Sequence, residues 1–480
     1  MNNANWLNSR EIVERIIIQG DLILETPASF GSGDKGELVD IPLLLDPLEG
    51  KSLLTGASLA GALRSYLRER ECGYGKTGDK KSLYLNLFGC QEDGEGEQSL
   101  LIVHDSLGDK STVEIRDGVK INSYTRTALD NHKFDFELLE AGTCFKIRME
   151  LLVQEKRSDE LIRGLSIALQ GLEKSEINLG IRKRRGFGKC KVKEWKVCRY
   201  NLKEPEGLIG WLEIDRLKID RTVVKTGSSI SALLNATNTD LDNRNSFTLD
   251  ATFSLNGSLL IGSGFDDVNA PDSVHLKSKR GGQAVFVLSG ISLAGALRAR
   301  ALRIANTVCK NGNAKAWVDL LFGPPIKSSK DKTSRYQNTA SKLITEETEI
   351  INPLDLVQSR IKIDRFTGGT CPTALFHEQP VFGLDTGINI HILIQQPEDA
   401  QIGMLLLLLK DLWTGDLPLG GEIGVGRGRL RGESVTLTYR SEDPEPEHWI
   451  IKQANNELDI DGDTANLEGF VNKFQEEMTG

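Results

Sequence analysis

Two loops each place an aspartate where a carboxylate could do chemistry. Asp40 lies in the stretch VDIP, which leads to an Asp-Pro pair at 46–47, and Asp272 lies in the stretch PDSV, which has no later Asp-Pro pair. A carboxylate in such a loop can bind a divalent cation or act as a base toward a hydroxyl group. It can equally cap a turn, which is a common role of aspartate in loops. Asp266 and Asp267, in a glycine loop just before Asp272, compete with it for the same role.

Two glycine-rich segments carry most of the clustered basic residues. The first reads RKRRGFGKCKVK at 182–193 and the second IGVGRGRLRG at 423–432. In the second segment, alternation predicts that the arginines share one face of a strand, where they could neutralise phosphates. An ordinary exposed edge strand, protected from aggregation by its charges, is the equally weighted alternative. The basic residues are Arg182, Lys183, Arg184, Arg185, Lys189, Lys191, Arg427, Arg429 and Arg431.

A ten-residue segment occurs twice and predicts a helix start each time. Residues 55–64 read TGASLAGALR and residues 289–298 read SGISLAGALR, with eight of ten positions identical. We expect Ser58 and Ser292 to be the N-caps, preceded by glycines that allow a close approach of backbone and ligand. The unpaired N–H groups and the dipole of such a helix start attract phosphate. The alternative is a capped helix whose arginines are solvated; those arginines are Arg64, Arg68, Arg298 and Arg300.

The repetition extends over most of the chain, so the chain is a duplicated unit. The segment LFG recurs at the same offset of 234, at 87–89 and 321–323. Asp159, Leu165, Leu169, Leu172 and Gly180 recur 240 positions later at helical spacing. Each copy therefore predicts a helix that ends before a glycine.

Each copy predicts the order strand, helix, two strands, helix, strand, which is that of a ferredoxin-like α+β fold. The expected strands are 15–24, 145–153 and 189–195 in the first copy, and 247–261, 388–395 and 429–439 in the second. We expect a first domain over 1–200, a linker region over 201–246, a second domain over 247–440 and an acidic, flexible tail over 441–480. The stretch DIDGD at 459–463 lacks the glycine and closing glutamate of a calcium loop and is expected to be solvated tail.

Composition is that of a folded protein with locally concentrated charge. The net charge is −9, but residues 441–480 hold 11 acidic and 2 basic residues, which leaves 57 of each among the other 440. Local basic clusters, not net charge, then decide whether an anionic partner can bind. The longest apolar run, 404–409, is too short to cross a membrane, and the N-terminus lacks a signal-peptide pattern. Seven cysteines without a C-x-x-C pair favour a reducing cytoplasm. The spacing of the histidines does not indicate a metal site, and the sequence has no Walker loop that would indicate an ATPase.

Taken together, these motifs resemble the RAMP superfamily, and they are most similar to backbone subunits of type III CRISPR effector complexes. Their order is a GSGD loop, D-x-P, D-P, the (T/S)-G-x-S-L-x-G-A-L-R helix start, L-F-G and a glycine-rich loop. The second copy adds 360–369 and 374–376, which are similar to the family's thumb, whereas the matching stretch of the first copy, 119–125, is degenerate. The resemblance covers about 15–200 and 247–440.

The resemblance implies two tandem ferredoxin-like (RRM-like) RAMP domains with loop and thumb insertions. Such subunits line up along CRISPR RNA, hold its backbone and expose it for pairing with a complementary target RNA. Many cut that target with an aspartate in the loop before the helix start. This implies Asp40 as a catalytic and metal-binding residue, Asp272 as its counterpart, and Mg²⁺ or another divalent cation as cofactor. The implied partners are CRISPR RNA, target RNA and other effector subunits, without a membrane.

The residues that we expect to contact RNA belong to the glycine loops, the helix starts, the thumb and the basic segments. They are Gly31, Ser32, Thr55, Gly56, Ser58, Arg64, Arg182, Lys183, Arg184, Arg185, Lys189, Gly262, Ser263, Ser289, Gly290, Ser292, Arg298, Arg365, Arg427 and Arg429. Three alternatives stay open: a scaffold without chemistry, a stand-alone guide-processing ribonuclease, and a duplicated α+β protein without a nucleic-acid role. The ribonuclease would need a His or Tyr acid–base pair, which the sequence does not place.

Overall fold

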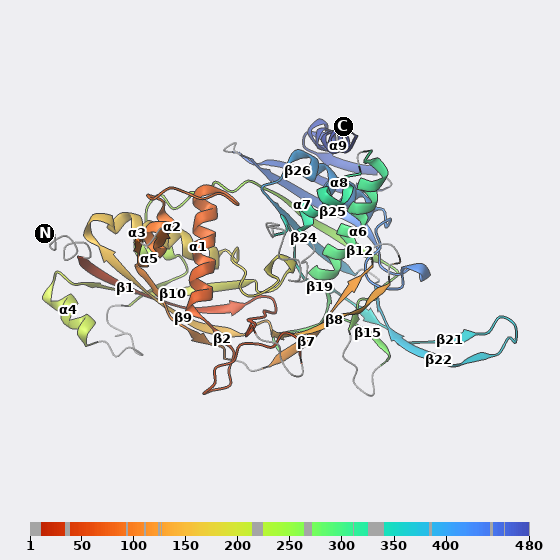
Figure 1. Ribbon diagram of the computed structural model, residues 1–480, viewed down its shortest axis with the longest axis horizontal. Coiled ribbons are helices and arrows are strands. Elements are labelled where there is room, and N and C mark those ends of the chain that lie inside the picture. Colours follow the sequence, from red (N-terminus) through yellow and green to blue (C-terminus); the bar gives the residue numbers. More distant parts are fainter. Residues whose placement is uncertain are drawn as a thin grey trace.

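The computed structural model shows two α+β domains lying side by side along its long axis (Figure 1). The residues that it describes are 11–33, 39–92, 95–109, 112–122, 125, 127–213, 224–263, 271–310, 312–324, 340–383, 386–441, 445–455 and 457–479. None of the helices in these ranges is long and apolar enough to cross a membrane.

The first domain has the predicted ferredoxin-like core. Its antiparallel sheet has the order β11-β10-β1-β9-β5, in which the four core strands stand in the order 4-1-3-2. Helices α1 and α3 pack over one face. The core elements are β1 (Ile12–Leu24), α1 (Gly56–Cys72), β5 (Leu101–Val103), β9 (Cys144–Gln154), α3 (Ser158–Glu173) and β10 (Cys190–Asn201). The shorter elements are β2 (Leu53–Leu54), α2 (Leu83–Phe88), β3 (Cys90–Glu92), β4 (Glu95–Glu97), β6 (Ser106–Leu107), η1 (Glu155–Arg157) and η2 (Lys183–Arg185).

Apolar alternation explains why β1 lies at the centre of that sheet. Ile16, Ile18 and Leu22 point into the core beneath the helices, whereas Ile17 packs on the opposite face with Trp211. Both faces of the strand are therefore covered, as expected for a central strand with a nearly continuous apolar run.

The second domain repeats this core within a nine-stranded sheet. The order is β16-β17-β19-β24-β12-β25-β26-β27, and β18 also pairs with β24. Its core elements are β12 (Ser246–Asn256), α6 (Gly290–Val308), β18 (Leu343–Thr345), β24 (Gly387–Gln395), α8 (Asp399–Trp413) and β25 (Arg429–Arg440). The others are β13 (Ser258–Leu259), β14 (Gly262–Ser263), β15 (Ser273–His275), β16 (Lys277–Arg280), β17 (Gln283–Leu288), α7 (Ala314–Phe322), β19 (Thr348–Ile351), β20 (Leu354–Asp355), β23 (Val381–Phe382) and η3 (Ile423–Val425). The six predicted core strands are thus confirmed, with ends shifted by several residues.

The segment after Ser441 is folded, so the prediction of a flexible tail is wrong. It forms β26 (Glu447–Ala454), β27 (Glu457–Asp461) and α9 (Thr464–Thr479). The two strands extend the second sheet, and α9 buries Phe470 and Phe474 against α8. The sequence did not indicate α9 as an amphipathic helix, because only four of its sixteen residues are buried and acidic residues are frequent around them.

Much of the expected linker region also belongs to the first domain. It contains α4 (Pro205–Leu212), β11 (Lys225–Gly227) and α5 (Ile230–Leu234). β11 pairs with β10, and α5 packs on α3. The irregular stretch from 235 to 245 remains the connection, as predicted.

Each domain carries a two-stranded hairpin outside its core sheet. The first consists of β7 (Val113–Ile121) and β8 (Ala128–Leu139), and the second of β21 (Gln358–Ile363) and β22 (Thr370–Gln379). The degenerate stretch of the first copy therefore still forms the hairpin. β7–β8 lies toward the second domain, whereas β21–β22 projects away from the far end of the molecule (Figure 1).

The domain junction is held by charged side chains of the first domain. Arg116 forms a buried ion pair with Glu347, and Lys189 pairs with Glu346 at 3.0 Å. Further contacts across the junction involve backbone groups of the second domain. Arg184 donates to the carbonyl of Ser341, Arg185 donates to that of Leu343, and Glu114 accepts from the N–H of Lys279. The first hairpin and the first basic segment thus bind the edge of the second domain.

Candidate functional site

Asp40 and Asp272 occupy the same place in the two domains. Asp40 accepts a hydrogen bond from the backbone N–H of Asp135 in β8 at 3.2 Å, and Asp272 accepts one from His377 in β22 at 2.7 Å. In both loops the next residue forms a parallel bridge to the next residue of that strand. Both aspartates are exposed at the base of their hairpin. The equivalence expected from sequence is therefore present in the fold.

The groups around the two aspartates differ. In the first domain the Asp117 side chain is only 9% exposed and pairs with Lys133 at 2.9 Å. The neighbouring Asp117 carboxyl group raises the pKa of the Asp135 carboxyl group. Hairpin register puts Ser359 and His377 at the corresponding positions of the second domain, joined at 2.9 Å from Oγ to Nδ1. Carboxylates surround the first loop, whereas a hydroxyl group and an imidazole surround the second.

The carboxylates fit a loosely held cation better than a closed metal site. Oδ1 of Asp117 and Oδ1 of Asp135 are buried without a hydrogen-bond partner. Within the described ranges, however, no three His, Cys, Asp or Glu side chains are arranged to hold a metal ion. Mg²⁺ often binds through one or two carboxylates, with water and substrate phosphates as the other ligands. Asp40 and Asp272 can each supply such a carboxylate. Asp266 and Asp267 lie outside the described residues.

The predicted segments of the first copy meet around one pocket of about 360 Å³. Its walls come from the loop with Gly31, the start of α1 with Thr55 and Ser58, and the basic glycine-rich segment of the first domain with Lys183. Gly180 borders it with a φ of +88°, and a Cβ there would lie 2.4 Å from the carbonyl oxygen of Ser29. A glycine is therefore required where the two loops cross. The pocket combines a helix start and a lysine, which suits an anionic group.

The N-caps are not the serines predicted from sequence. Thr55 caps α1 by accepting from the N–H of Ser58, and Ser289 caps α6 by accepting from the N–H of Ile291. Ser58 and Ser292 lie inside the first turn instead. The helices begin three residues earlier than expected, because Thr55 and Ser289, and not Ser58 and Ser292, accept the N–H groups of the first turn.

The start of α6 lies at the domain junction. A Cβ on Gly290 would lie 2.3 Å from the carbonyl oxygen of Arg185 in the first domain. Gly56, at the start of α1, donates its N–H to Asp105 at 2.6 Å. The basic glycine-rich segment of the first domain, 182–193, therefore passes beside the start of α6 in the second domain. A ligand that bound to this segment and to the start of α6 would cross the domain junction.

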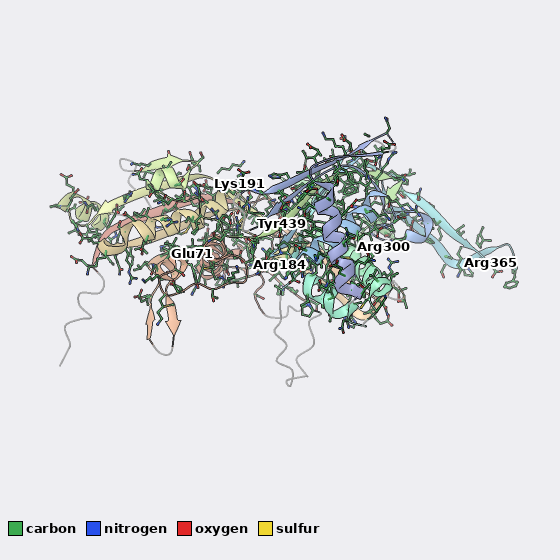
Figure 2. The ribbon with its side chains drawn as sticks, turned by 90° about the horizontal axis from the view of Figure 1, so that it is seen from above. Glu71, Arg184, Lys191, Arg300, Arg365 and Tyr439 are labelled. Carbon is green, nitrogen blue, oxygen red and sulfur yellow. The ribbon has the colours of Figure 1, made fainter. Side chains whose placement is uncertain are left out.

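Arg182 is the basic residue with the most unusual surroundings. Its guanidinium lies 4.5 Å above the ring of Phe134 and 4.4 Å above that of Phe136. Burial lowers its pKa to about 10, and within the described ranges no carboxylate pairs with it. Such a cation, supported by aromatic faces, suits a phosphate or a base. Arg184 lies between the two domains (Figure 2), where its donors serve the junction.

The second glycine loop has exchanged this chemistry for ion pairs. Glu422 has the left-handed backbone of Arg182 and pairs with Arg427 at 2.8 Å. Arg427 is buried and also binds Glu378, the counterpart of Phe136. Burial raises the pKa of the Glu378 carboxyl group. Of the three arginines predicted to share one exposed face, Arg429 and Arg431 are exposed at alternate positions of β25, whereas Arg427 precedes the strand and is buried.

The remaining predicted residues are scattered. Arg298 pairs with Asp319 and donates to the carbonyl of Gly323. Arg64 lies 5.9 Å from the ring of Tyr84. Arg365 lies at the tip of the second hairpin (Figure 2). Three further residues lie in loops or short strands near their aspartates: Ser32, Gly262 and Ser263.

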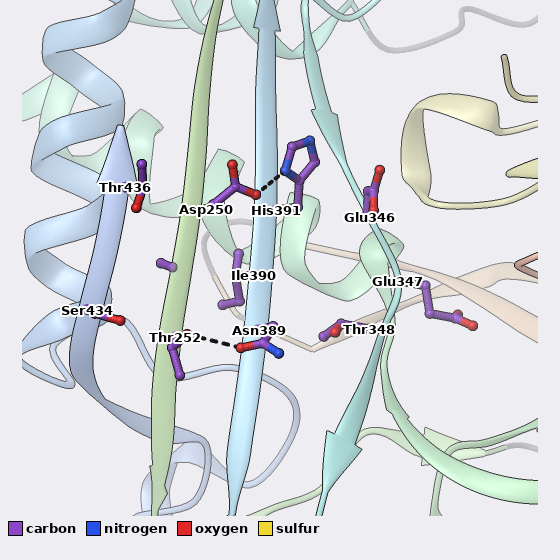
Figure 3. A pocket seen from close by; sticks show the side chains of 11 residues that line it. Asp250, Thr252, Glu346, Glu347, Thr348, Asn389, Ile390, His391, Ser434 and Thr436 are labelled. Atoms are coloured by element: carbon purple, nitrogen blue, oxygen red, sulfur yellow. Dashed lines mark hydrogen bonds and ion pairs between the residues drawn. The ribbon is translucent and has the colours of Figure 1, made fainter. Parts of the chain in front are cut away.

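One polar pocket was not foreseen from sequence. It has about 420 Å³ and lies on the face of the second sheet opposite α8, beside the junction (Figure 3). His391 Nδ1 lies 2.5 Å from the Asp250 carboxylate, and this pairing raises the pKa of His391 against the effect of burial. The alternation of polar residues along β12 and β24 indicates in the sequence that one face of the sheet is polar. Only the pairing of the two strands, however, brings Asp250 and His391 together.

Two comparisons with known proteins agree with this geometry. A family model described as the RAMP superfamily matches residues 21–191 and 252–431. A Streptococcus thermophilus protein, "CRISPR system Cms endoribonuclease Csm3", is 25% identical over 206 residues, covering 38% of this chain and 89% of that protein. One such protein corresponds in length to about one half of the chain.

Proposed function

The chain belongs to the RAMP superfamily, and from this premise we propose that it is a CRISPR RNA-binding backbone subunit of a type III effector complex. It holds guide RNA across both domains and cleaves complementary target RNA at two positions, next to Asp40 and Asp272. The observation that supports this most is the equivalent anchoring of both exposed aspartates by the outer strand of their hairpins.

The guide would run along the helix starts and glycine loops. The pocket at the start of α1 and the Arg182 guanidinium can accept its phosphates, and the chain connects this pocket to the start of α6 through the junction. Backbone contacts of this kind position RNA without reading its sequence. Binding should therefore tolerate a scrambled guide and weaken steeply with salt.

Each aspartate would face the backbone of the paired target strand. The carboxylate accepts the proton of a 2′-hydroxyl group, whose oxygen bonds to the adjacent phosphorus as the bond to the 5′-oxygen breaks, and the departing 5′-oxygen takes a proton from water. A divalent cation bound by the same carboxylate would stabilise the charge that develops on the phosphate. The hydrogen bond that each aspartate accepts from a backbone N–H orients its side chain.

The test is target cleavage by the assembled complex carrying Asp40→Asn, Asp272→Asn or both, with and without EDTA. Each single variant should lose one product by about 10²-fold or more, the range for one acid–base group. Asp46→Asn is the matched control, because Asp46 caps a turn by accepting from Leu48 and Glu49. An unchanged product pattern in every variant would reject cleavage by this chain and leave a scaffold that binds RNA without chemistry.

A further inference from the structure

The domain junction is a template for how a neighbour could dock at either end of the chain. One face of the second domain corresponds to the binding side of the first domain, and one edge of the first domain corresponds to the bound edge of the second. We call these the outgoing face and the incoming face. Among the described residues both carry exposed side chains, such as Val425 and Leu48. Whether they suit one another can be judged position by position.

The outgoing face has lost the side chains that make the junction. Hairpin register and the parallel bridges at Phe136 and Glu378 make Gln358 the counterpart of Arg116, and Leu356 that of Glu114. The shared positive-φ glycines, offset by 240, make Gly424, Val425 and Arg429 the counterparts of Arg184, Arg185 and Lys189. Of the junction's four cations, only the last has a cationic counterpart.

Apolar side chains replace the charges there. Leu356 is 55% and Val425 is 61% exposed, and Leu354 and Val357 beside them are more than half exposed as well. Gly424 is also exposed, whereas Arg184 and Arg185 are partly covered by the second domain. The segment 354–357 adjoins Gln358, which accepts a hydrogen bond from Arg427. These exposed apolar side chains therefore lie on neighbouring segments, as is typical of a protein interface.

The incoming face is equally unlike its counterpart. β5 and β18 occupy the same place beside β9 and β24, so that His104 and Asp105 correspond to Glu346 and Glu347. The loop positions of Lys279 and Arg280 correspond to Pro47 and Leu48, and Leu48 is 92% exposed. Pro47 has no N–H to donate, unlike Lys279.

A second copy docked in the junction geometry would form none of the junction's ion pairs. Gln358 would meet Asp105, and Arg429 would meet His104. Val425 and Gly424 would face carbonyl groups without offering donors, and Leu356 would face Pro47. Two interfaces with mismatched polar groups discriminate against each other even where their shapes agree.

We propose that the chain does not extend itself: its two ends are not complementary, and the neighbour beyond its second domain is a different subunit that presents an apolar docking face. This rests on the proposed role in an RNA-bound assembly, but not on cleavage. The first experiment below is therefore done without RNA, and the second measures subunit composition and not cleavage, so that failure of the proposed chemistry would leave both outcomes unaffected.

The first test is sedimentation of the purified full chain and of two grafted variants. The outgoing graft carries Leu356→Glu, Gln358→Arg, Gly424→Arg and Val425→Arg; a Cβ on Gly424 meets no atom within 4 Å. The incoming graft carries Pro47→Lys, Leu48→Arg, His104→Glu and Asp105→Glu. Wild type and each graft alone should stay monomeric up to about 100 μM, well above the micromolar constants of weak specific interfaces. The two grafts together should form a 1:1 dimer that dissociates as salt is raised.

Two results would overturn the proposal. Head-to-tail oligomers of the wild-type chain would show that its ends are complementary. Persistently monomeric grafts, with wild-type thermal stability, would show that these positions do not determine which faces match. The second test is the subunit composition of the complex assembled with Leu356→Asp and Val425→Asp, measured by native mass spectrometry. The guide should be retained and the neighbour beyond the second domain lost at least tenfold, whereas the control Leu458→Asp with Ile460→Asp loses none. An unchanged composition would reject the apolar docking face.

Discussion

Glu347→Gln should open the domain junction without unfolding either domain. The Glu347 and Arg116 side chains are 0% and 3% exposed, and Glu347 also binds Arg280 at 3.3 Å. Removing one partner of a buried ion pair typically costs about 3–5 kcal/mol, because the other charge stays buried and unpaired. Arg116 keeps its ion pair with Glu114, so we expect the lower end, about 3 kcal/mol.

Amide hydrogen exchange measures this opening directly. The N–H groups of Lys279 and Gly282 donate across the junction to Glu114 and Glu140, at 3.1 and 2.9 Å. A loss of about 3 kcal/mol corresponds to roughly 100-fold faster exchange at these two amides, since about 1.4 kcal/mol is tenfold. Amides in the core strands β1 and β12 should keep their protection.

Two comparisons make the result decisive. Glu155→Gln removes an exposed pair with Lys203, 58% and 51% exposed, and should change stability by less than about 1 kcal/mol. The double variant Arg116→Met with Glu347→Leu should cost less than the sum of the two single variants, because neither buried charge is then left opposite an apolar side chain. If Glu347→Gln costs no more than the exposed control, the junction does not depend on this ion pair.

Three further outcomes follow from the fold. Burial lowers the pKa of His275 to about 4. Because the unfolded chain binds the proton more readily, on the order of 3 kcal/mol of stability should be lost as pH falls from about 6.5 to 4. Urea unfolding measures this loss, and a His275→Leu variant should lack it. Deleting residues 445–479 should destabilise the second domain by at least about 5 kcal/mol and cause aggregation visible in light scattering, because the loss of Phe470 and Phe474 exposes the apolar face of α8. A soluble deletion variant with an unchanged melting temperature would contradict this. Gly188→Ala should prevent or severely weaken folding of the first domain, because its φ is +74° and a Cβ would lie 1.8 Å from a carbonyl oxygen; a wild-type circular dichroism melt would contradict it.

The sequence by itself determined the duplication, the ferredoxin-like order and the two candidate aspartates. Repeated motifs at constant offsets carry this information because homologous cores keep their apolar spacing and their obligatory glycines, as at Gly180 and Gly420. The helix starts were also predictable, although their caps were assigned three residues too late. These features depend on neighbours in sequence, which a single chain displays.

Only the tertiary structure decided how the basic residues are used. Arg182, Arg184 and Arg185 lie within four consecutive positions, yet the first stacks on phenylalanines and the other two bind the second domain. The acidic C-terminal segment folds because a few apolar residues at helical spacing pack against α8. The high content of acidic residues gave no indication of this packing. The difference between the groups beside Asp40 and Asp272 likewise arises from hairpin register, since strand pairing joins residues whose separation in sequence carries no signal.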